Sequence, residues 1–267
     1  MVSAPLIIGH RGASAVAPEN TLAAFSRAME DGADGIEFDV RLSRDRVPVV
    51  IHDANLRRTG QIDRLVGNLD ASELQQCDVC AWFRPVQGEN KLYTGPVPTL
   101  AQVFELFHET SALLYLEMKS DSADARILVK AVINEIYKTQ IADQVVVSSF
   151  DLSAIALVKK IDPAVPTAAL FEPKLFQPLS YIRRLKMIDL AVEHHANEIA
   201  LHSSLVSSRF VQKATQFGLP VVVWTVDDQE WIRRAQRLGI KALITNNPAA
   251  LISKCNSETN KHANTSR

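Results

Sequence analysis

The stretch Leu6-Ile7-Ile8-Gly9-His10-Arg11-Gly12 joins an apolar, strand-like run directly to a histidine and an arginine. Three later strand-like runs also end in charged or ionisable residues: Gly35-Ile36-Glu37-Phe38-Asp39, Val49-Val50-Ile51-His52-Asp53 and Leu114-Tyr115-Leu116-Glu117-Met118-Lys119. In a chain that alternates strands and helices, such ends fall on one rim of a parallel barrel, where the active sites of that fold are built. The four stretches therefore predict one pocket that gathers histidines, carboxylates and cations.

Eight strand-like segments alternate with helical stretches, and eight is the number of strands in a (β/α)8 TIM barrel. The segments are Leu6 to Gly9, Ile36 to Val40, Leu113 to Glu117, Val145 to Ser149, Thr167 to Phe171, Glu198 to Leu201, Pro220 to Val226 and Ala242 to Thr245. Asn20 is placed to cap the first helix. The 267 residues are enough for one such barrel with a large core. We predict the α/β class and a single TIM-barrel domain over residues 1–255.

Two segments do not follow the alternation of strands and helices. Residues 54–97 contain the glycines Gly60, Gly67, Gly88 and Gly95 and are too long for an ordinary connection. We interpret them as a small insertion after the second strand, beside the rim. Residues 256–267 are polar and lack any hydrophobic period, which predicts a flexible tail.

Composition excludes several classes of protein. Lys and Arg number 29 against 30 Asp and Glu, so no overall field attracts nucleic acid or an anionic membrane. Three cysteines do not make a secreted disulfide framework, and Cys77 and Cys80 form a CxxC without a second pair of zinc ligands. The stretch Met1-Val2-Ser3-Ala4-Pro5 lacks the basic and apolar regions of a signal peptide, and no later run is as long as a membrane span. We expect a cytoplasmic protein with no nucleic-acid partner and no stable membrane insertion.

Glu37 and Asp39 are candidate metal ligands, because side chains two apart on a strand point to the same face. Inside a barrel, two ionised carboxylates repel each other and lose solvation unless a cation compensates them. Glu117 and Lys119 repeat the spacing, which adds a third carboxylate and an ammonium group. Three oxygen ligands suit Mg²⁺ or Ca²⁺ better than zinc. The alternative is a structural network of Glu and Lys salt bridges inside the barrel.

His10 and His52 are candidate proton-transfer groups. Near neutral pH, one imidazole can accept a proton from a nucleophile while a second, protonated one delivers a proton to the leaving oxygen. Arg11 supplies a fork-shaped cation that matches phosphate oxygens. A lone histidine at a strand end is more often a packing residue, and we interpret the remaining histidines in that way: His108, His194, His195, His202 and His262. Together these residues indicate metal-assisted phosphoester chemistry.

The order and spacing of eight blocks resemble the glycerophosphodiester phosphodiesterase family over nearly the whole chain. The blocks are His10-Arg11-Gly12 with Pro18-Glu19-Asn20-Thr21, Glu37-Phe38-Asp39-Val40, His52-Asp53, Leu56-Arg57-Arg58-Thr59, Pro98-Thr99-Leu100, Glu117-Met118-Lys119, Ser149-Phe150 and Trp224-Thr225-Val226. The resemblance implies metal ligands at Glu37, Asp39 and Glu117, acid/base histidines at His10 and His52, and phosphate contacts from Arg11 and Lys119. It also implies that Trp224 forms an apolar wall near the glycerol of the substrate. The chain departs from the family at Asn246, where relatives often have Asp, and at Arg58-Thr59-Gly60, which lacks a doubled Thr.

The sequence therefore predicts metal-dependent hydrolysis of glycerophosphodiesters to sn-glycerol 3-phosphate and an alcohol, and the resemblance implies a cyclic phosphate intermediate. One alternative is a lysophospholipase D, which needs an exposed apolar lip; the polar residues Gln75, Gln76, Gln87 and Glu89 in the insertion argue against one. Another alternative is a catalytically silent barrel that binds phosphorylated ligands. The preferred head group, the physiological ion and the oligomeric state are left open.

Overall fold

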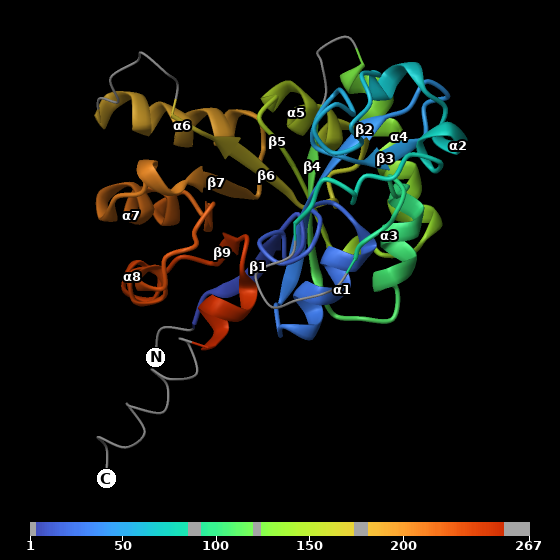
Figure 1. Ribbon diagram of the computed structural model, residues 1–267. Helices are drawn as coiled ribbons and strands as arrows, with labels where there is room; N and C mark the ends of the chain where they lie inside the picture. Colours follow the sequence, from blue (N-terminus) through green and yellow to red (C-terminus); the bar gives the residue numbers. More distant parts are fainter. Residues whose placement is uncertain (1–3, 85–91, 120–123, 174–180, 254–267) are drawn as a thin grey trace.

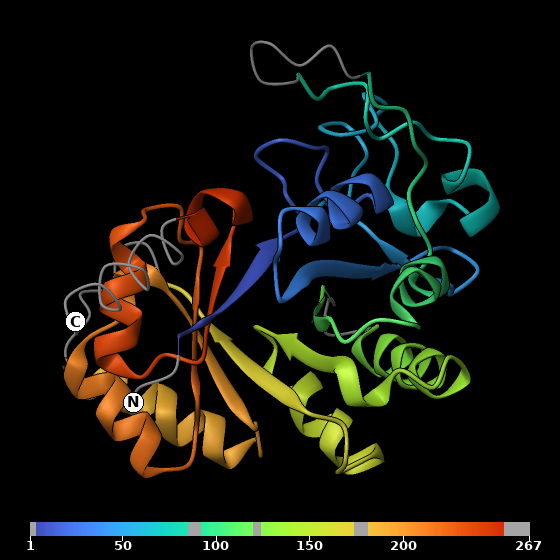
Figure 2. The ribbon, with the colours of Figure 1, turned by 90° about the horizontal axis from the view of Figure 1, so that it is seen from below.

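The computed structural model of the chain describes residues 4–84, 92–119, 124–173 and 181–253. A parallel β-barrel is surrounded by helices (Figure 1). Viewed from below, the segment between the second barrel strand and the third gathers outside the barrel (Figure 2). The tail predicted at residues 256–267 lies outside the described residues.

Eight parallel strands close the barrel. They are β1 (Leu6–His10), β2 (Gly35–Leu42), β4 (Leu113–Met118), β5 (Val145–Ser149), β6 (Thr167–Phe171), β7 (Glu198–His202), β8 (Val221–Trp224) and β9 (Ala242–Thr245). Neighbouring strands pair in parallel, and β1 pairs with both β2 and β9, which closes the sheet. The predicted TIM barrel is confirmed, and each of the eight predicted strand segments forms a barrel strand.

Alternation along the strands divides the core into two layers. Inward-facing apolar side chains fill the barrel: Ile8, Tyr115, Val146, Ala168, Leu170, Ala200, Val222, Ala242 and Ile244. Outward-facing side chains pack against α1 (Leu22–Glu30), α3 (Leu100–Phe107), α4 (Ala125–Lys138), α5 (Leu152–Ile161), α6 (Tyr181–Glu193), α7 (Ser208–Gln216) and α8 (Glu230–Leu238). Burial on both faces explains why these strands are nearly continuous apolar runs. None of the helices in the described part of the chain has the length and apolar character needed to cross a bilayer.

The insertion has an apolar cluster of its own. This cluster is formed by β3 (Pro48–Val50), which directly precedes the insertion, together with the short 3-10 turn η1 (Val66–Asn68) and α2 (Ala71–Leu74) of the insertion. Their apolar side chains pack together with those of the neighbouring loops: Val49, Ile51, Leu56, Val66, Leu69, Leu74, Val79 and Val97. The predicted small insertion after the second strand is confirmed, although its cluster begins before residue 54.

The stretch from Val49 to Asp53 reaches the pocket differently from the prediction. Its end reaches the pocket, as predicted, but it does not run parallel to the barrel strands, because β3 pairs antiparallel with β2. Val50 lies opposite Val40, and the Ile51 amide donates to the Asp39 carbonyl over 2.9 Å. The chain therefore returns from the rim toward Asp39, and this return brings the next residue, His52, to the pocket.

The start of α1 also differs from the prediction. Thr21, and not Asn20, is the N-cap, and its side chain accepts a hydrogen bond from the Ala24 amide over 3.2 Å. Asn20 has a φ of 56°, in the left-handed region that Asn tolerates better than most residues. Its side-chain Nδ2 donates to Asp39 Oδ2 over 2.8 Å, and its Oδ1 accepts from the Asp39 amide over 3.2 Å. A residue predicted to cap a helix instead holds a candidate metal ligand.

Candidate active site

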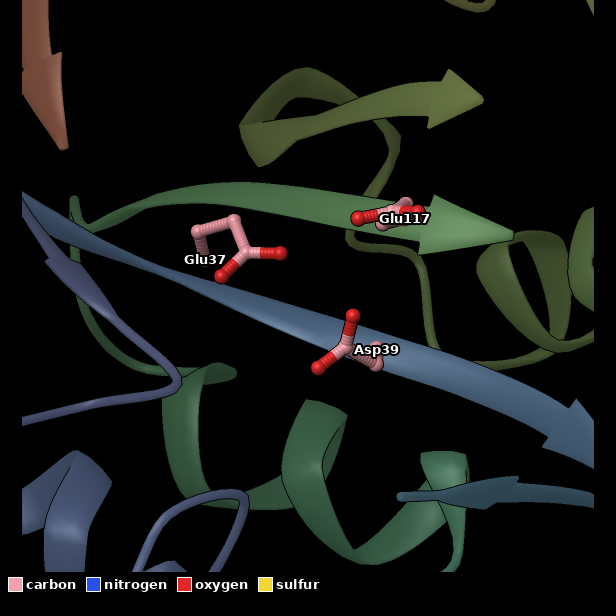
Figure 3. A group of neighbouring side chains, drawn as sticks. All are labelled: Glu37, Asp39 and Glu117. Carbon is pink, nitrogen blue, oxygen red and sulfur yellow. The ribbon is translucent and has the colours of Figure 1, made fainter. Parts of the chain in front are cut away.

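Three carboxylates meet inside the barrel at the ends of β2 and β4. Asp39 and Glu117 lie opposite each other in the parallel ladder, and Glu37 is two residues before Asp39 on the same face. Figure 3 shows the three side chains pointing toward one another. One ligand atom from each lies within 4.8 Å of the others, and exposure is only 6% for Glu37, 1% for Asp39 and 8% for Glu117. The predicted cluster of three carboxylates is therefore formed.

Burial in one cluster gives these carboxylates unequal affinities for protons. Burial raises the pKa of Glu37 well above its usual value, and the charges of Asp39 and Glu117 add to the effect. Burial and Asp39 also raise the pKa of Glu117 to about 7, against the opposing effect of Lys119. Burial alone would raise the pKa of Asp39, but Lys119 and Arg11 lower it below its usual range. Asp39 is therefore the carboxylate that stays ionised most readily.

The arrangement fits a hard divalent cation. Lys119 Nζ lies 2.6 Å from Glu117 Oε1 and 3.2 Å from Asp39 Oδ1, and Arg11 Nε lies 3.1 Å from Asp39 Oδ2. Apart from these ion pairs with Lys119, the buried atoms Asp39 Oδ1 and Glu117 Oε1 have no hydrogen-bond partner among the described residues. Three carboxylates also exceed the two cations by one charge. A buried donor set made only of carboxylate oxygens, two of which have only Lys119 beside them in the described residues, suits Mg²⁺ or Ca²⁺ better than a salt-bridge network alone.

The turn after β1 brings Arg11 over the cluster. Arg11 and Gly12 have φ values of 55° and 83°, both in the left-handed region. At Gly12 an added Cβ would lie 2.5 Å from the Ala24 backbone, so glycine is required where this turn packs on α1. The turn directs the Arg11 amide to Glu37 Oε2 over 3.2 Å. In the motif His10-Arg11-Gly12, the glycine is therefore required by packing on α1, and the arginine pairs with the nearby carboxylates.

His52 is held by a chain of charged side chains. Its Nδ1 lies 2.6 Å from Asp53 Oδ1, and Arg58 Nε donates to Asp53 Oδ2 over 2.7 Å. Arg58 also donates two hydrogen bonds to the Glu19 carboxylate, over 2.7 and 2.8 Å, and Glu19 accepts a further one from Arg11 over 2.8 Å. Burial opposes the shift, but Arg58 and His52 lower the pKa of Asp53 to about 2. An ionised carboxylate therefore faces the His52 ring, and Arg58 links the insertion to the rim.

His10 is held by an amide instead of a carboxylate. Asn246 Nδ2 donates to Asp227 Oδ2 over 2.7 Å, which turns Asn246 Oδ1 toward His10 Nδ1, 2.7 Å away. The Ser14 hydroxyl donates to the same Oδ1 over 3.0 Å. Since Oδ1 can only accept, the His10 proton lies on Nδ1 in the neutral ring. Nε2, which lies 3.9 Å from Glu37 Oε2, is then free to accept a proton. Burial lowers the pKa of His10, and this also favours the neutral ring.

Replacing Asn246 by alanine removes the acceptor that keeps the proton on Nδ1 of His10. We expect part of the neutral ring to change to the Nε2-protonated form and kcat to fall about tenfold, with a smaller change in KM. The tautomer is measured from the side-chain nitrogen chemical shifts of His10 in the metal-free protein. Ser14→Ala is the matched control, because it removes a donor to the same Asn246 oxygen without removing the acceptor of the ring. A ring that keeps its proton on Nδ1 in Asn246→Ala would contradict this role.

A cavity of about 260 Å³ opens onto these groups. Its lining includes seven of the eight predicted site residues: His10, Arg11, Glu37, His52, Glu117, Lys119 and Trp224. The eighth, Asp39, lies behind them within the carboxylate cluster. Trp224 packs edge-to-face against Phe150, with ring centroids 5.5 Å apart, and its buried Nε1 makes no hydrogen bond. The structure thus brings all eight predicted residues to one place.

Several residues of the site were not predicted from the sequence to belong to it. Glu19, Asn20 and Asp53 lie inside the quoted family blocks, so their position in a block was the available signal. Asp227 follows the block Trp224-Thr225-Val226 directly, and Glu172 had no signal at all. Of the histidines interpreted as packing residues, His202 lies 5.3 Å from Trp224 between ring centroids, and His262 lies outside the described residues.

Comparison with known proteins agrees with this geometry. The model of the glycerophosphoryl diester phosphodiesterase family matches residues 10–250. A glycerophosphodiester phosphodiesterase of Caldanaerobacter subterraneus subsp. tengcongensis is 33% identical over 247 residues, which cover 92% of this chain and 96% of that protein. The structure of an Oleispira antarctica phosphodiesterase in complex with the product sn-glycerol-3-phosphate is 26% identical, with a TM-score of 0.81 and coverage of 95% of this chain and 97% of that one. A Thermotoga maritima glycerophosphodiester phosphodiesterase structure is also 26% identical, with a TM-score of 0.71 and coverage of 95% and 99%. Because the family match spans most of the barrel and the site, the chain belongs to the glycerophosphoryl diester phosphodiesterase family of enzymes.

Proposed function

We propose that the protein hydrolyses glycerophosphodiesters to sn-glycerol 3-phosphate and an alcohol. The observation that carries the proposal is the joint placement of two histidines, two cations and a buried carboxylate cluster around one cavity. A site that only binds phosphate needs cations but no pair of histidines with different partners. The Oleispira antarctica structure, which holds sn-glycerol-3-phosphate, supports the same product here.

Each site residue has a role in this proposal. Arg11 and Lys119 hold the phosphoryl oxygens. Their positive charges stabilise the negative charge that develops on these oxygens in the transition state. His10, neutral with Nε2 free, accepts a proton, and His52, beside the Asp53 carboxylate, donates one to the leaving oxygen. Glu37, Asp39 and Glu117 hold Mg²⁺ or Ca²⁺, which when bound supplies further positive charge to the phosphoryl group. Trp224 lines the cavity, and we assign it the apolar wall beside the glycerol.

A steady-state assay with glycerophosphocholine, glycerophosphoethanolamine and lysophosphatidylcholine tests the function. We expect hydrolysis of the first two with release of sn-glycerol 3-phosphate. Hydrolysis of lysophosphatidylcholine alone would favour the lysophospholipase D, and hydrolysis of none would favour the silent barrel. The lysophospholipid arm is needed because Trp82, Phe83 and Tyr93 form an aromatic cluster in the insertion, whereas Gln87 and Glu89 lie outside the described residues.

The nucleophile is tested with an analogue of glycerophosphocholine that lacks only the 2-hydroxyl group. We propose that this hydroxyl attacks phosphorus and expels the head-group alcohol, which leaves a cyclic phosphate that water then opens to sn-glycerol 3-phosphate. The hydroxyl is tethered beside the reacting atom, so its attack avoids several kcal/mol of positioning entropy. The analogue is expected to bind as a competitive inhibitor and to react at a small fraction of the parent rate. A rate close to that of glycerophosphocholine would instead leave direct attack by water.

A cytoplasmic location, the lack of a nucleic-acid partner and the domain limits at residues 1–255 stay predictions from the sequence.

A further inference from the structure

In a second half of the cavity, two lining residues, Phe150 and Glu172, have no role in the chemistry above. It is formed at the ends of β5, β6 and β8; β5 is next to β4, and β6 and β8 lie farther around the barrel from the carboxylate cluster (Figure 1). Phe150, Glu172 and Trp224 line it, each placed directly after a barrel strand or at its last residue. This half therefore combines two aromatic rings with one carboxylate.

The strand register shows why Glu172 faces the cavity. Leu170 points into the barrel interior, so Glu172, two residues later, is expected to point to the same face of the strand. Phe171 pairs with Leu201, which places Glu172 at the level of His202, and His202 in turn pairs with Trp224. Glu172 is thus part of a layer of rim side chains above the apolar interior of the barrel.

Charges in the cavity follow a definite order. Its permanent cations, Arg11 and Lys119, both lie on the side of the carboxylate cluster. Lys119 Nζ lies 5.8 Å from the centroid of the Phe150 ring, so this aromatic ring begins where the phosphate-binding cations end. Glu172 follows the next strand, β6, where it is exposed, and the described residues provide it with no hydrogen bond or ion pair. The order across the cavity is cation, aromatic ring, carboxylate.

A ligand complementary to this order carries phosphate at one end, a short carbon link and a cation at the other. Aromatic faces and a carboxylate together favour an ammonium group, through cation–π attraction and charge. A neutral polyol would need matched donors and acceptors, but nearby hydroxyls are already engaged: Tyr115 donates to Glu198 over 2.8 Å and Ser148 to the Leu116 carbonyl over 3.3 Å.

We propose that Glu172 and Phe150 form a subsite for the ammonium group of the leaving alcohol. The substrates it selects are glycerophosphodiesters of amino alcohols over those of neutral polyols. The inference rests on the proposed function and adds to it the class of head group. Glu172 acts on specificity, so it affects substrate binding more than the chemical step.

The test compares kcat/KM for glycerophosphocholine, glycerophosphoethanolamine and glycerophosphoglycerol in the wild-type protein and three variants. Glu172→Gln keeps the shape of the side chain and removes its charge, Phe150→Leu removes the ring, and Glu105→Gln removes an exposed carboxylate on α3 as the matched control. We expect Glu172→Gln to lower kcat/KM about tenfold for the two cationic substrates, mainly through KM, and to leave glycerophosphoglycerol nearly unchanged. Phe150→Leu should reduce the choline ester most, and Glu105→Gln should change nothing.

Three outcomes would overturn the subsite. Equal losses for all three substrates in Glu172→Gln would assign this carboxylate to the glycerol arm that they share. Unchanged kinetics in both Glu172→Gln and Phe150→Leu would show that the head group lies elsewhere. A wild-type protein that hydrolyses none of the three would overturn the proposed function and the subsite with it, which distinguishes that failure from the first two.

Discussion

Turnover is expected to be almost abolished in Glu37→Gln, Asp39→Asn and Glu117→Gln, while each variant remains folded. Each substitution keeps the size of the side chain and removes one of the charges that would hold the divalent ion. Chelation of the wild-type protein is expected to have the same effect, and added Mg²⁺ or Ca²⁺ to restore activity. The measurements are kcat with glycerophosphocholine, metal content by elemental analysis and thermal melting of each variant.

Stability of the metal-free variants provides a test independent of activity. The pKa of Glu117 is raised to about 7, so its contribution to stability is fully present below its unfolded pKa and is lost progressively as pH rises through about 7. Glu117→Gln is therefore expected to melt at a higher temperature than the wild type at pH 8, when both are metal-free. Asp39 has a lowered pKa, so its ionised form stabilises the fold, and Asp39→Asn should melt at a lower temperature. Full activity in exhaustively chelated protein without detectable metal would refute the metal site.

His52→Ala and His10→Ala are each expected to lower kcat by about 10²-fold or more, with a smaller change in KM. The His52 ring contacts the Asp53 carboxylate, whereas the His10 ring contacts the Asn246 amide oxygen. Both rings line the same cavity, as a pair that accepts and donates protons requires. The measurement is steady-state kinetics with glycerophosphocholine, accompanied by a thermal melt of each variant.

His194→Ala is the matched control for the two histidine variants. His194 lies at the end of α6, where its Nδ1 is 2.9 Å from the Leu190 carbonyl, far from the cavity lining. We expect wild-type kinetics from it. If either His10→Ala or His52→Ala kept wild-type turnover with an unchanged melt, that histidine would be a packing residue.

Much of the candidate site could be predicted from the sequence, because the side chains of a strand alternate between its two faces with a period of two residues. Alternation along a strand placed Glu37 and Asp39 on one face, and the closed parallel topology placed their strand end beside that of Glu117. Apolar runs buried on both faces predicted all eight barrel strands. The same reasoning was wrong for the stretch that ends at His52, since an apolar run does not show whether its strand pairs parallel or antiparallel.

Only the tertiary structure decided which residues hold the candidate catalytic groups in place. Closure of the barrel brings β9 beside β1, so that Asn246 meets His10 across 236 residues of sequence. The insertion likewise brings Arg58 to Glu19 across 39 residues. Sequence periods report which face a side chain takes within its own element, but hydrogen-bond partners depend on how distant loops come together and on rotamers chosen in that packed environment. The sequence by itself therefore determined the barrel, its rim and the residue types of the chemistry, whereas barrel closure and loop packing determined which atoms hold each histidine.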